Sequence, residues 1–266
     1  MQGKFLLYND HVLMRIASLS PAVTEILFAL GKGGSLVCLD QYSDYPESVK
    51  ELPHLKGHQK LDAAELASYK PDLVFTSTLV QTKLAEELRK AELTVIHQDP
   101  RTLAEVEQSF LEIGTLLSCE DRARALSLRF RQGMNEVKKR ASALPRHPHV
   151  YIEEWHNPPM VSGNWVPEVL RIAGGVPLPL PPKNPSREVS LEEIRAFDPE
   201  LIVLSICGAG SLARKELLTQ REGWKELRAV REGRVRVIDD SLLNRPGPRL
   251  VEGARRLYGW IFEVLH

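Results

Sequence analysis

Cysteine is scarce in this chain. Its 266 residues include three cysteines, Cys38, Cys119 and Cys207, which lie far apart and form no Cys-x-x-Cys pair. This odd and widely spaced set argues against a disulfide framework and against a zinc site, and we expect no bound metal. Lys plus Arg and Asp plus Glu are both 35, so the chain has no electrostatic footprint for nucleic acid or for an anionic membrane. No apolar run approaches the roughly 18 residues of a membrane-spanning helix.

Catalytic and export signatures are also missing. There is no Ser/His/Asp order, P-loop or His-Glu-x-x-His motif, and Gly208-Ala209-Gly210 alone is too weak a pattern to indicate a nucleotide site. Residues 1–13 contain one basic residue, no small-residue cleavage site and no cysteine placed for lipid attachment. The sequence as written therefore predicts a cytoplasmic protein, and a periplasmic or membrane-anchored one if a native leader was trimmed.

One pattern occurs twice in the chain. Residues 61–78 and residues 189–206 each read as a short amphipathic helix, a Pro-Asp or Pro-Glu turn, and an apolar run typical of a strand buried on both faces. The helix and strand that follow each copy, residues 84–99 and 224–240, also correspond. The duplication predicts an α/β fold of two similar lobes, with a ligand cleft between them.

A long helix is expected between the two copies. Ser118 followed by Asp121 has the pattern of a capping box, and apolar residues then recur at helical spacing until Pro145. A helix packed along both lobes would keep their relative motion small. The expected division is an N-terminal extension (1–13), an N-terminal α/β lobe (14–117), a connecting helix (118–145) and a C-terminal α/β lobe (146–266).

Several motifs in both lobes resemble those of one known family. They are Arg15 to Gly31 with its Ser-Pro turn, Tyr42-Ser43-Asp44-Tyr45-Pro46, Lys70-Pro71-Asp72, Asn157-Pro158-Pro159, Ala173-Gly174-Gly175 and Pro248-Arg249. From Arg15 to His266 the chain resembles the vitamin B12-binding proteins of ABC importers, among the helical-backbone (class III) substrate-binding proteins that also carry siderophores and haem. It resembles the branch of that group that lacks signal peptides.

The resemblance implies a fold, a function and a partner. The fold is two Rossmann-like lobes joined by one long α-helix. The function is non-catalytic binding of a corrinoid such as cobalamin, or of a related tetrapyrrole or metal chelate, with no catalytic cofactor. The partners are this small molecule and an ABC permease, and we expect a monomer.

The residues that would line the cleft differ from those of the well-known B12 binders. Matching on the shared motifs places His58, Ser77 and Ser186 at or near three cleft tryptophan positions, and Met160 at a cleft phenylalanine, whereas Tyr42 matches a cleft tyrosine. The scaffold is therefore kept while its aromatic anchors are mostly absent.

The chain has two tryptophans of its own in the second lobe. Trp155 follows Glu153 and Glu154 at the end of an expected strand, and Trp165 lies ten residues further on. We expect these rings to be ligand platforms, with packing within the lobe as the alternative. Adjacent carboxylates on a strand point to opposite faces, so only one of the two glutamates can face the cleft, and we place Glu154 among the ligand residues.

Other candidates lie on loops at the carboxyl ends of the expected strands. Ser20 begins a helix whose N–H groups would suit an anionic group, or it is a plain N-cap. A metal inside a tetrapyrrole could be bound by Cys207, His58 or His156. The alternative for Cys207 is a small apolar residue in a tight turn, and for the two histidines a position at the rim of the cleft or on the surface. Arg245, and less so Arg249, either binds a ligand carboxylate or phosphate or fixes its loop by a salt bridge.

Two further expectations concern function outside the cleft. The family presents one carboxylate per lobe to its permease, and alignment places Glu192 in the second lobe and Asp62 or Glu65 in the first, where an acid also favours the helix dipole. The alternative function is an intracellular enzyme or chaperone that acts on a cofactor precursor with Glu153 or Glu154 and Cys207.

Overall fold

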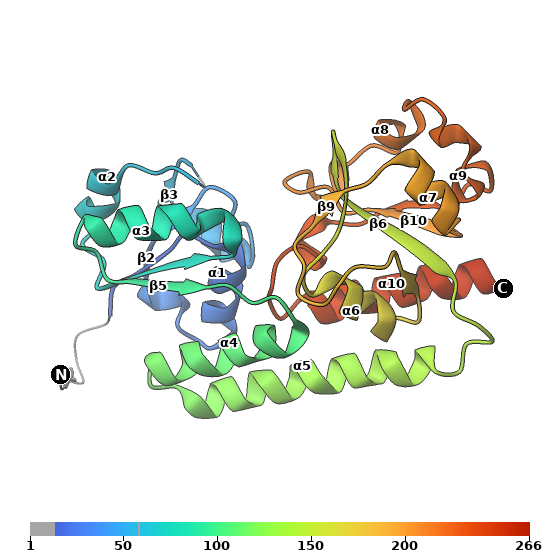
Figure 1. The fold of residues 1–266 in the computed structure, drawn as a ribbon. Helices are drawn as coiled ribbons and strands as arrows, with labels where there is room; N and C mark the ends of the chain where they lie inside the picture. Colours follow the sequence, from blue (N-terminus) through green and yellow to red (C-terminus); the bar gives the residue numbers. More distant parts are fainter. Residues whose placement is uncertain (1–13, 58) are drawn as a thin grey trace. The chain divides into compact units, whose positions relative to one another are not determined.

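The computed structural model describes residues 14–57 and 59–266, which form two compact units that divide between Asp99 and Pro100 (Figure 1). His58, one of the candidate ligand residues, lies outside the described residues.

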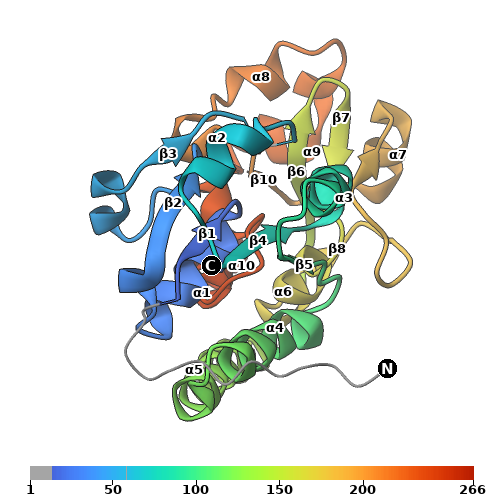
Figure 2. The same cartoon turned by 90° about the vertical axis from the view of Figure 1, so that its left-hand side faces the viewer.

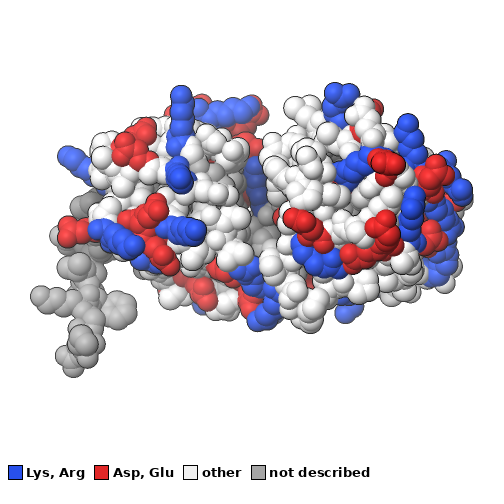
Figure 3. All heavy atoms as spheres, turned by 45° about the horizontal axis from the view of Figure 1, so that its top comes forward, with Lys and Arg blue, Asp and Glu red and all other residues white. Residues whose placement is uncertain are grey.

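Within the described ranges no helix combines the length and the apolar character needed to cross a bilayer. The face of the molecule in Figure 3 carries both signs of charge interspersed, as the balanced composition predicts.

The first unit is a parallel α/β layer. Its sheet has the order β3-β2-β1-β4-β5, with every neighbouring pair parallel. The strands are β1 Ile16–Ser18, β2 Leu36–Asp40, β3 His54–Leu55, β4 Leu73–Ser77 and β5 Val95–Gln98, and the helices are α1 Pro21–Ala29, α2 Ala63–Ser68 and α3 Thr82–Lys90. All of β4 is buried, which is why it reads as a continuous apolar run in the sequence.

The second unit has a mixed sheet of the order β11-β10-β6-β7-β9, with β8 beside β6. Its strands are β6 His149–His156, β7 Pro159–Val161, β8 Val176–Pro177, β9 Arg187–Glu188, β10 Leu201–Leu204 and β11 Val235–Val237. Its helices are α4 Leu103–Leu116, α5 Glu120–Ala141, α6 Val166–Ile172, α7 Leu191–Phe197, α8 Glu216–Thr219, α9 Arg228–Arg231 and α10 Leu250–Leu265. Strands β6, β10 and β11 are parallel, whereas β7 runs antiparallel beside β6 (Figure 2).

The duplicated sequence folds in the same way in both units, so the expected two-lobe α/β fold is confirmed. Helix α2 with strand β4 corresponds to helix α7 with strand β10, and each strand pairs with the first strand of its unit, β1 or β6. The residues before the Pro-Asp and Pro-Glu turns, Lys70 and Asp198, share a left-handed backbone with φ of 47° and 48°.

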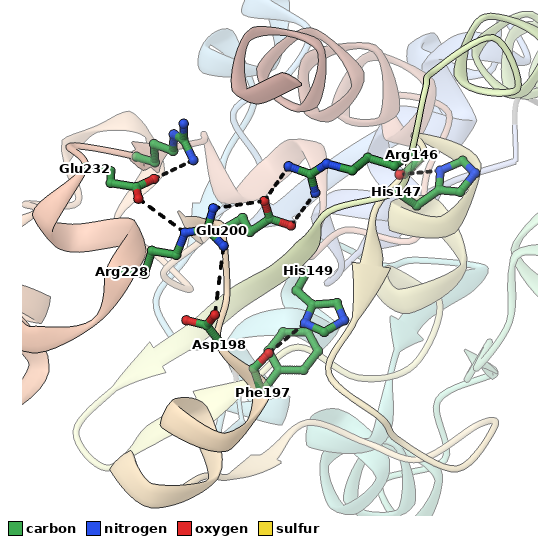
Figure 4. A network of polar contacts seen from close by, with 10 residues as sticks. Arg146, His147, His149, Phe197, Asp198, Glu200, Arg228 and Glu232 are labelled. Carbon is green, nitrogen blue, oxygen red and sulfur yellow. Dashed lines mark hydrogen bonds and ion pairs between the residues drawn. The ribbon is translucent and has the colours of Figure 1, made fainter. Parts of the chain in front are cut away.

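In each copy a side chain at the start of the neighbouring strand donates a hydrogen bond to a carbonyl at the C-terminal end of the duplicated helix. Arg15 precedes β1 and its guanidinium donates to the carbonyl of Tyr69 at 2.6 Å. His149 begins β6 and its Nδ1 donates to the carbonyl of Phe197 at 2.7 Å (Figure 4). Since the last carbonyls of a helix lack helical partners, both contacts satisfy groups that the turn would otherwise leave open.

An ion-pair network holds the turn of the second copy. Glu200 accepts two hydrogen bonds of 2.7 Å from Arg146 and lies 3.6 Å from Arg228, which also contacts Glu232 (Figure 4). The Arg146 guanidinium holds the pKa of Glu200 below its usual value. This network lies at the amino end of β10, so it stabilises the fold away from the loops at the strands' carboxyl ends.

The capping box expected before the long helix is wrong. Helix α5 spans 22 residues and begins after Cys119, with no side-chain cap. Ser118 instead terminates α4: its φ is 50°, and the next N–H, that of Cys119, donates to the carbonyl of Gly114 at 2.8 Å. This is the Schellman arrangement, in which satisfying the carbonyls of the preceding helix takes precedence over capping the next one. Helix α5 packs against α4, α6 and α10, all in the second unit.

Candidate ligand-binding edges

In both units the segments at the carboxyl ends of the strands carry much of the exposed large apolar surface. Ten large apolar side chains are exposed in the described part of the chain, and six of them follow or end a strand at this edge. The six are Tyr42, Tyr45, Leu79 and Val80 in the first unit and Trp155 and Leu212 in the second. Ligands of open α/β sheets bind at this edge, so we treat each edge as a candidate ligand surface.

A buried polar chain positions the loops after β1 and β2. Asp40, which is fully buried, accepts a hydrogen bond of 2.6 Å from the Ser43 hydroxyl, which lies 2.9 Å from the hydroxyl of Thr24. Thr24 in turn donates to the hydroxyl of Ser18 at 2.9 Å. Asp40 also accepts from the backbone N–H of Tyr42 at 3.3 Å, so the chain fixes the base of the loop that exposes this ring.

Ser20 occupies the N-cap position of α1 without capping it through its side chain. Its side chain makes no bond to the first turn and the residue is 4% exposed. Its carbonyl accepts from the hydroxyls of Ser18 and Thr24. The contribution of Ser20 to the edge is therefore its backbone, and contact with a ligand stays a prediction.

Gln81 joins the loop after β4 to the loop after β1. The amide of this fully buried residue accepts from the N–H of Ser77 at 2.8 Å and donates to the carbonyl of Leu19 at 2.7 Å. Between them Thr78 has φ 64° and ψ 161°, a conformation that a β-branched residue adopts only under strong constraint. Ser77 is itself buried, and the strained turn exposes the following Leu79 and Val80.

The two glutamates of β6 have separate environments, as the strand argument predicts. Glu153 is fully buried and forms a bidentate pair with Arg221, with N–O distances of 2.6 and 2.7 Å. The Tyr151 hydroxyl donates to the same carboxylate at 3.1 Å. Glu154 is half-buried and lies at an irregularity in the pairing with β7, where Glu153 opposes Val161 but Trp155 opposes Met160.

Glu154 contacts neutral groups. Its Oε2 accepts from the Ser186 hydroxyl at 2.5 Å, and the Cys207 thiol lies close enough to influence the pKa of the carboxyl group. Burial raises the pKa of Glu154, and the Asp240 carboxylate acts in the same direction. Burial, with Glu154 and Asp240, also raises the pKa of the Cys207 thiol. The thiol therefore stays protonated at neutral pH, which disfavours a thiolate ligand to a metal.

The loop after β10 is held by two polar residues that the sequence pattern did not reveal. Asp240 accepts from the N–H groups of Gly208 at 3.0 Å and Gly210 at 2.8 Å. Asn244 donates to the sulfur of Cys207 at 3.1 Å and to the carbonyl of Ser205 at 2.8 Å. Gly208 and Gly210 both have positive φ. Two glycines so close together in the sequence predict a tight loop, although not the side chains that bind its N–H groups.

The two tryptophans differ in what they offer a ligand. Trp155 is 41% exposed, its indole N–H donates to the Asn157 carbonyl at 3.0 Å, and its ring centroid is 5.5 Å from that of His156. Trp165 is 3% exposed and its indole N–H donates to the carbonyl of Leu243 at 2.7 Å. Trp155 presents a ring at the edge, whereas the ring of Trp165 is packed within the second unit.

The remaining candidates also lie on these elements. Met160 is half-buried on β7, opposite Trp155. Arg245 and Arg249 are half-buried in the loop before α10, and both have interactions of their own. Asp62 is the N-cap of α2 and accepts from the N–H of Ala64 at 2.8 Å, and Glu65 is exposed in the same first turn. Glu192 is exposed in the first turn of α7.

A groove elsewhere in the second unit is separate from these edges. It has a volume of about 480 Å³ and lies between α5 and α10, over Phe130, Gly133 and Val251, with Arg129 and Arg255 at its rim. None of the candidate ligand residues lines it, so the groove and the edge loops are distinct features of this unit.

Comparisons with known proteins agree with the fold. The vitamin B12-binding protein of Vibrio cholerae is 26% identical over 252 residues, which cover 91% of this chain and 87% of that protein. An uncharacterised ABC transporter substrate-binding lipoprotein of Bacillus subtilis is 27% identical over 258 residues, with 91% and 78% covered. The structure of a periplasmic haem-binding protein from Pseudomonas aeruginosa matches with a TM-score of 0.84 at 25% identity, covering 96% of this chain and 95% of that one.

These findings overturn the enzyme hypothesis. Of the groups that the hypothesis used, Glu153 has both oxygens bound by Arg221, and burial raises the pKa of the Cys207 thiol. The family model for periplasmic binding proteins matches residues 16–242, most of the chain. This chain therefore belongs to the periplasmic binding protein family and is a non-catalytic substrate-binding protein of the ABC-transporter type.

Proposed function

We propose that this protein binds a corrinoid such as cobalamin, or a related tetrapyrrole or metal chelate, and delivers it unchanged to an ABC permease. The observation that carries the proposal is the placement of six of the ten exposed large apolar side chains at the carboxyl edges of the two sheets. A broad macrocycle has two apolar faces, and aromatic and aliphatic side chains bind such faces by burying them from water.

The aromatic residues on these loops support a flat ligand. Tyr42 and Tyr45 are 45% and 48% exposed in the first unit, and Trp155 is 41% exposed in the second. A relative is named for vitamin B12 and a structural neighbour for haem, which supports a corrinoid or a related tetrapyrrole or metal chelate as the ligand. We also assign contacts with the ligand to Ser20, Ser77, Met160, Cys207 and Arg245 and, outside the described residues, to His58. Trp165, whose ring is packed within the second unit, is left out of this set. We consider the protein a monomer.

Of the cytoplasmic location and the periplasmic or membrane-anchored location considered above, the second fits this function better. One relative is named a lipoprotein, and the neighbouring haem-binding protein is named periplasmic. We therefore place the protein in the periplasm or on a membrane anchor, where a permease would accept its ligand.

An absorption spectrum tests the proposal directly. Protein purified after growth with cobalamin should carry a stoichiometric corrin band, and calorimetric titration of the ligand-free protein should show one site for cobalamin or for haem. A protein that binds neither compound would contradict the ligand class and leave the family assignment standing.

Docking to the permease predicts a second result. We propose that Asp62, Glu65 and Glu192 contact basic residues of the permease, since all three are exposed at the N-terminal ends of the duplicated helices. Replacing the three with alanine should abolish most transport in cells while the affinity for ligand stays unchanged. Glu86→Ala with Glu222→Ala, two exposed carboxylates outside these helices, is the control. Unchanged transport in the triple variant would refute the docking assignment.

A further inference from the structure

Glu154 is an acidic group at the ligand edge of the second unit that has no basic partner among the described residues. Its carboxyl group accepts from the Ser186 hydroxyl, and the charged group that acts on its pKa is the Asp240 carboxylate. The neighbouring Glu153 is, by contrast, fully neutralised by Arg221. A half-buried carboxyl group without a cation is costly unless something else satisfies it.

A β-bulge and the Ser186 hydroxyl set the orientation of this carboxyl group and its role as a hydrogen-bond acceptor. The pairing of β6 with β7 shifts between Glu153 and Trp155, so Glu154 is the extra residue of a β-bulge. Bulges re-aim side chains and are frequent beside functional sites. The hydroxyl of Ser186 accepts from the N–H of Gly163 at 2.9 Å, which leaves its proton for Glu154.

The other charged groups at this edge already have hydrogen-bond or ion-pair partners within the protein. Asp240 accepts from two backbone N–H groups, Arg221 is paired with Glu153, and Arg245 has interactions of its own. The β6–β7 hairpin also contains two buried polar atoms without a hydrogen-bond partner, Nδ1 of His156 and Oγ of Ser162. In native proteins such atoms are commonly satisfied by a bound water or by a ligand.

We propose that Glu154 is a specificity-determining residue that selects ligands whose periphery carries hydrogen-bond donors, such as primary amides, over ligands that carry carboxylates. The proposal rests on the proposed function and refines its ligand class to an amide-decorated macrocycle. An amide N–H would donate to the carboxyl group of Glu154. A ligand carboxylate would instead bring a second negative charge into a partly desolvated site, which is unfavourable.

A matched pair of ligands and two variants test this inference. The ligands are the dicyano forms of one corrin, with its side-chain amides intact and with those amides hydrolysed to acids. The proteins are the wild type, Glu154→Gln, and Glu222→Gln, which removes the same charge from an exposed loop of the same unit. A hydrogen bond to a charged group is worth about 1.5–3 kcal/mol, so wild type should bind the amide form at least about tenfold more tightly.

The variants separate a local effect from a general one. Glu154→Gln should reduce the ratio of the two dissociation constants by about tenfold, whereas Glu222→Gln should leave it within about threefold of wild type. Circular dichroism confirms that both variants are folded. If wild type binds the amide form but Glu154→Gln keeps its ratio, this inference alone is wrong. If wild type prefers the acid form, the inference is also wrong. If it binds neither corrin, the inference falls, and the proposed function falls with it only when haem does not bind either.

Discussion

Replacing Glu153 with alanine should lower the free energy of unfolding by about 3–5 kcal/mol, because it leaves the Arg221 guanidinium without its anion in a largely buried position. The Arg221 side chain is 16% exposed and that of Glu153 is fully buried, so water cannot replace the lost partner. The same guanidinium lies 4.7 Å above the Trp224 ring, and the pair therefore ties the segment after β10 to the sheet. Urea titration followed by circular dichroism measures the loss.

An exposed pair of the same kind provides the control. Arg214 and Glu216 are 3.5 Å apart with side chains 73% and 55% exposed. Since exposed ion pairs contribute roughly 0–1 kcal/mol, Glu216→Ala should change the unfolding free energy by no more than that. The double variant Glu153→Met with Arg221→Leu should recover much of the loss, because apolar residues of similar size replace buried pairs well. A loss below about 1 kcal/mol in Glu153→Ala would contradict this account.

Replacing Trp155 with alanine should weaken binding of a corrinoid by roughly thirtyfold to several hundredfold. The loss of one stacked ring from a desolvated site costs about 2–4 kcal/mol, and each 1.4 kcal/mol is tenfold in the dissociation constant. Tyr42→Ala should have an effect of the same order, since its ring is 45% exposed at the edge of the first unit. Calorimetric titration of cobalamin and of haem into each folded variant measures both.

The controls distinguish a ligand contact from general surface change. Phe262 is an aromatic side chain 45% exposed near the end of α10, so Phe262→Ala should leave the affinity unchanged. Trp165→Ala should instead lower stability, because its ring is buried and hydrogen-bonded within the second unit. If Trp155→Ala and Tyr42→Ala both bind within about threefold of wild type, the edge assignment is wrong.

The strands and helices were largely predictable from local patterns. The buried strands β4 and β10 read directly from their apolar runs, and the duplicated turn residues Lys70 and Asp198 have the same backbone. The boundary at Ser118 was misread, because the residue fits two patterns. Its N-cap chemistry was visible in the sequence, whereas its role at the end of α4 depends on the carbonyl of Gly114, a packing feature.

The α/β class and the duplication could be read from the sequence alone, because hydrophobic period is a local property of the chain. Which side chains are available at the carboxyl edges of the sheets depends on contacts made in the folded protein. Glu153 is paired with Arg221, which is 68 residues away, and the Trp165 indole donates a hydrogen bond to Leu243, which is 78 residues away. Glu154 instead has a carboxyl group whose hydrogen-bond donor is the Ser186 hydroxyl. Such partners come together through folding, so spacing along the chain does not reveal them.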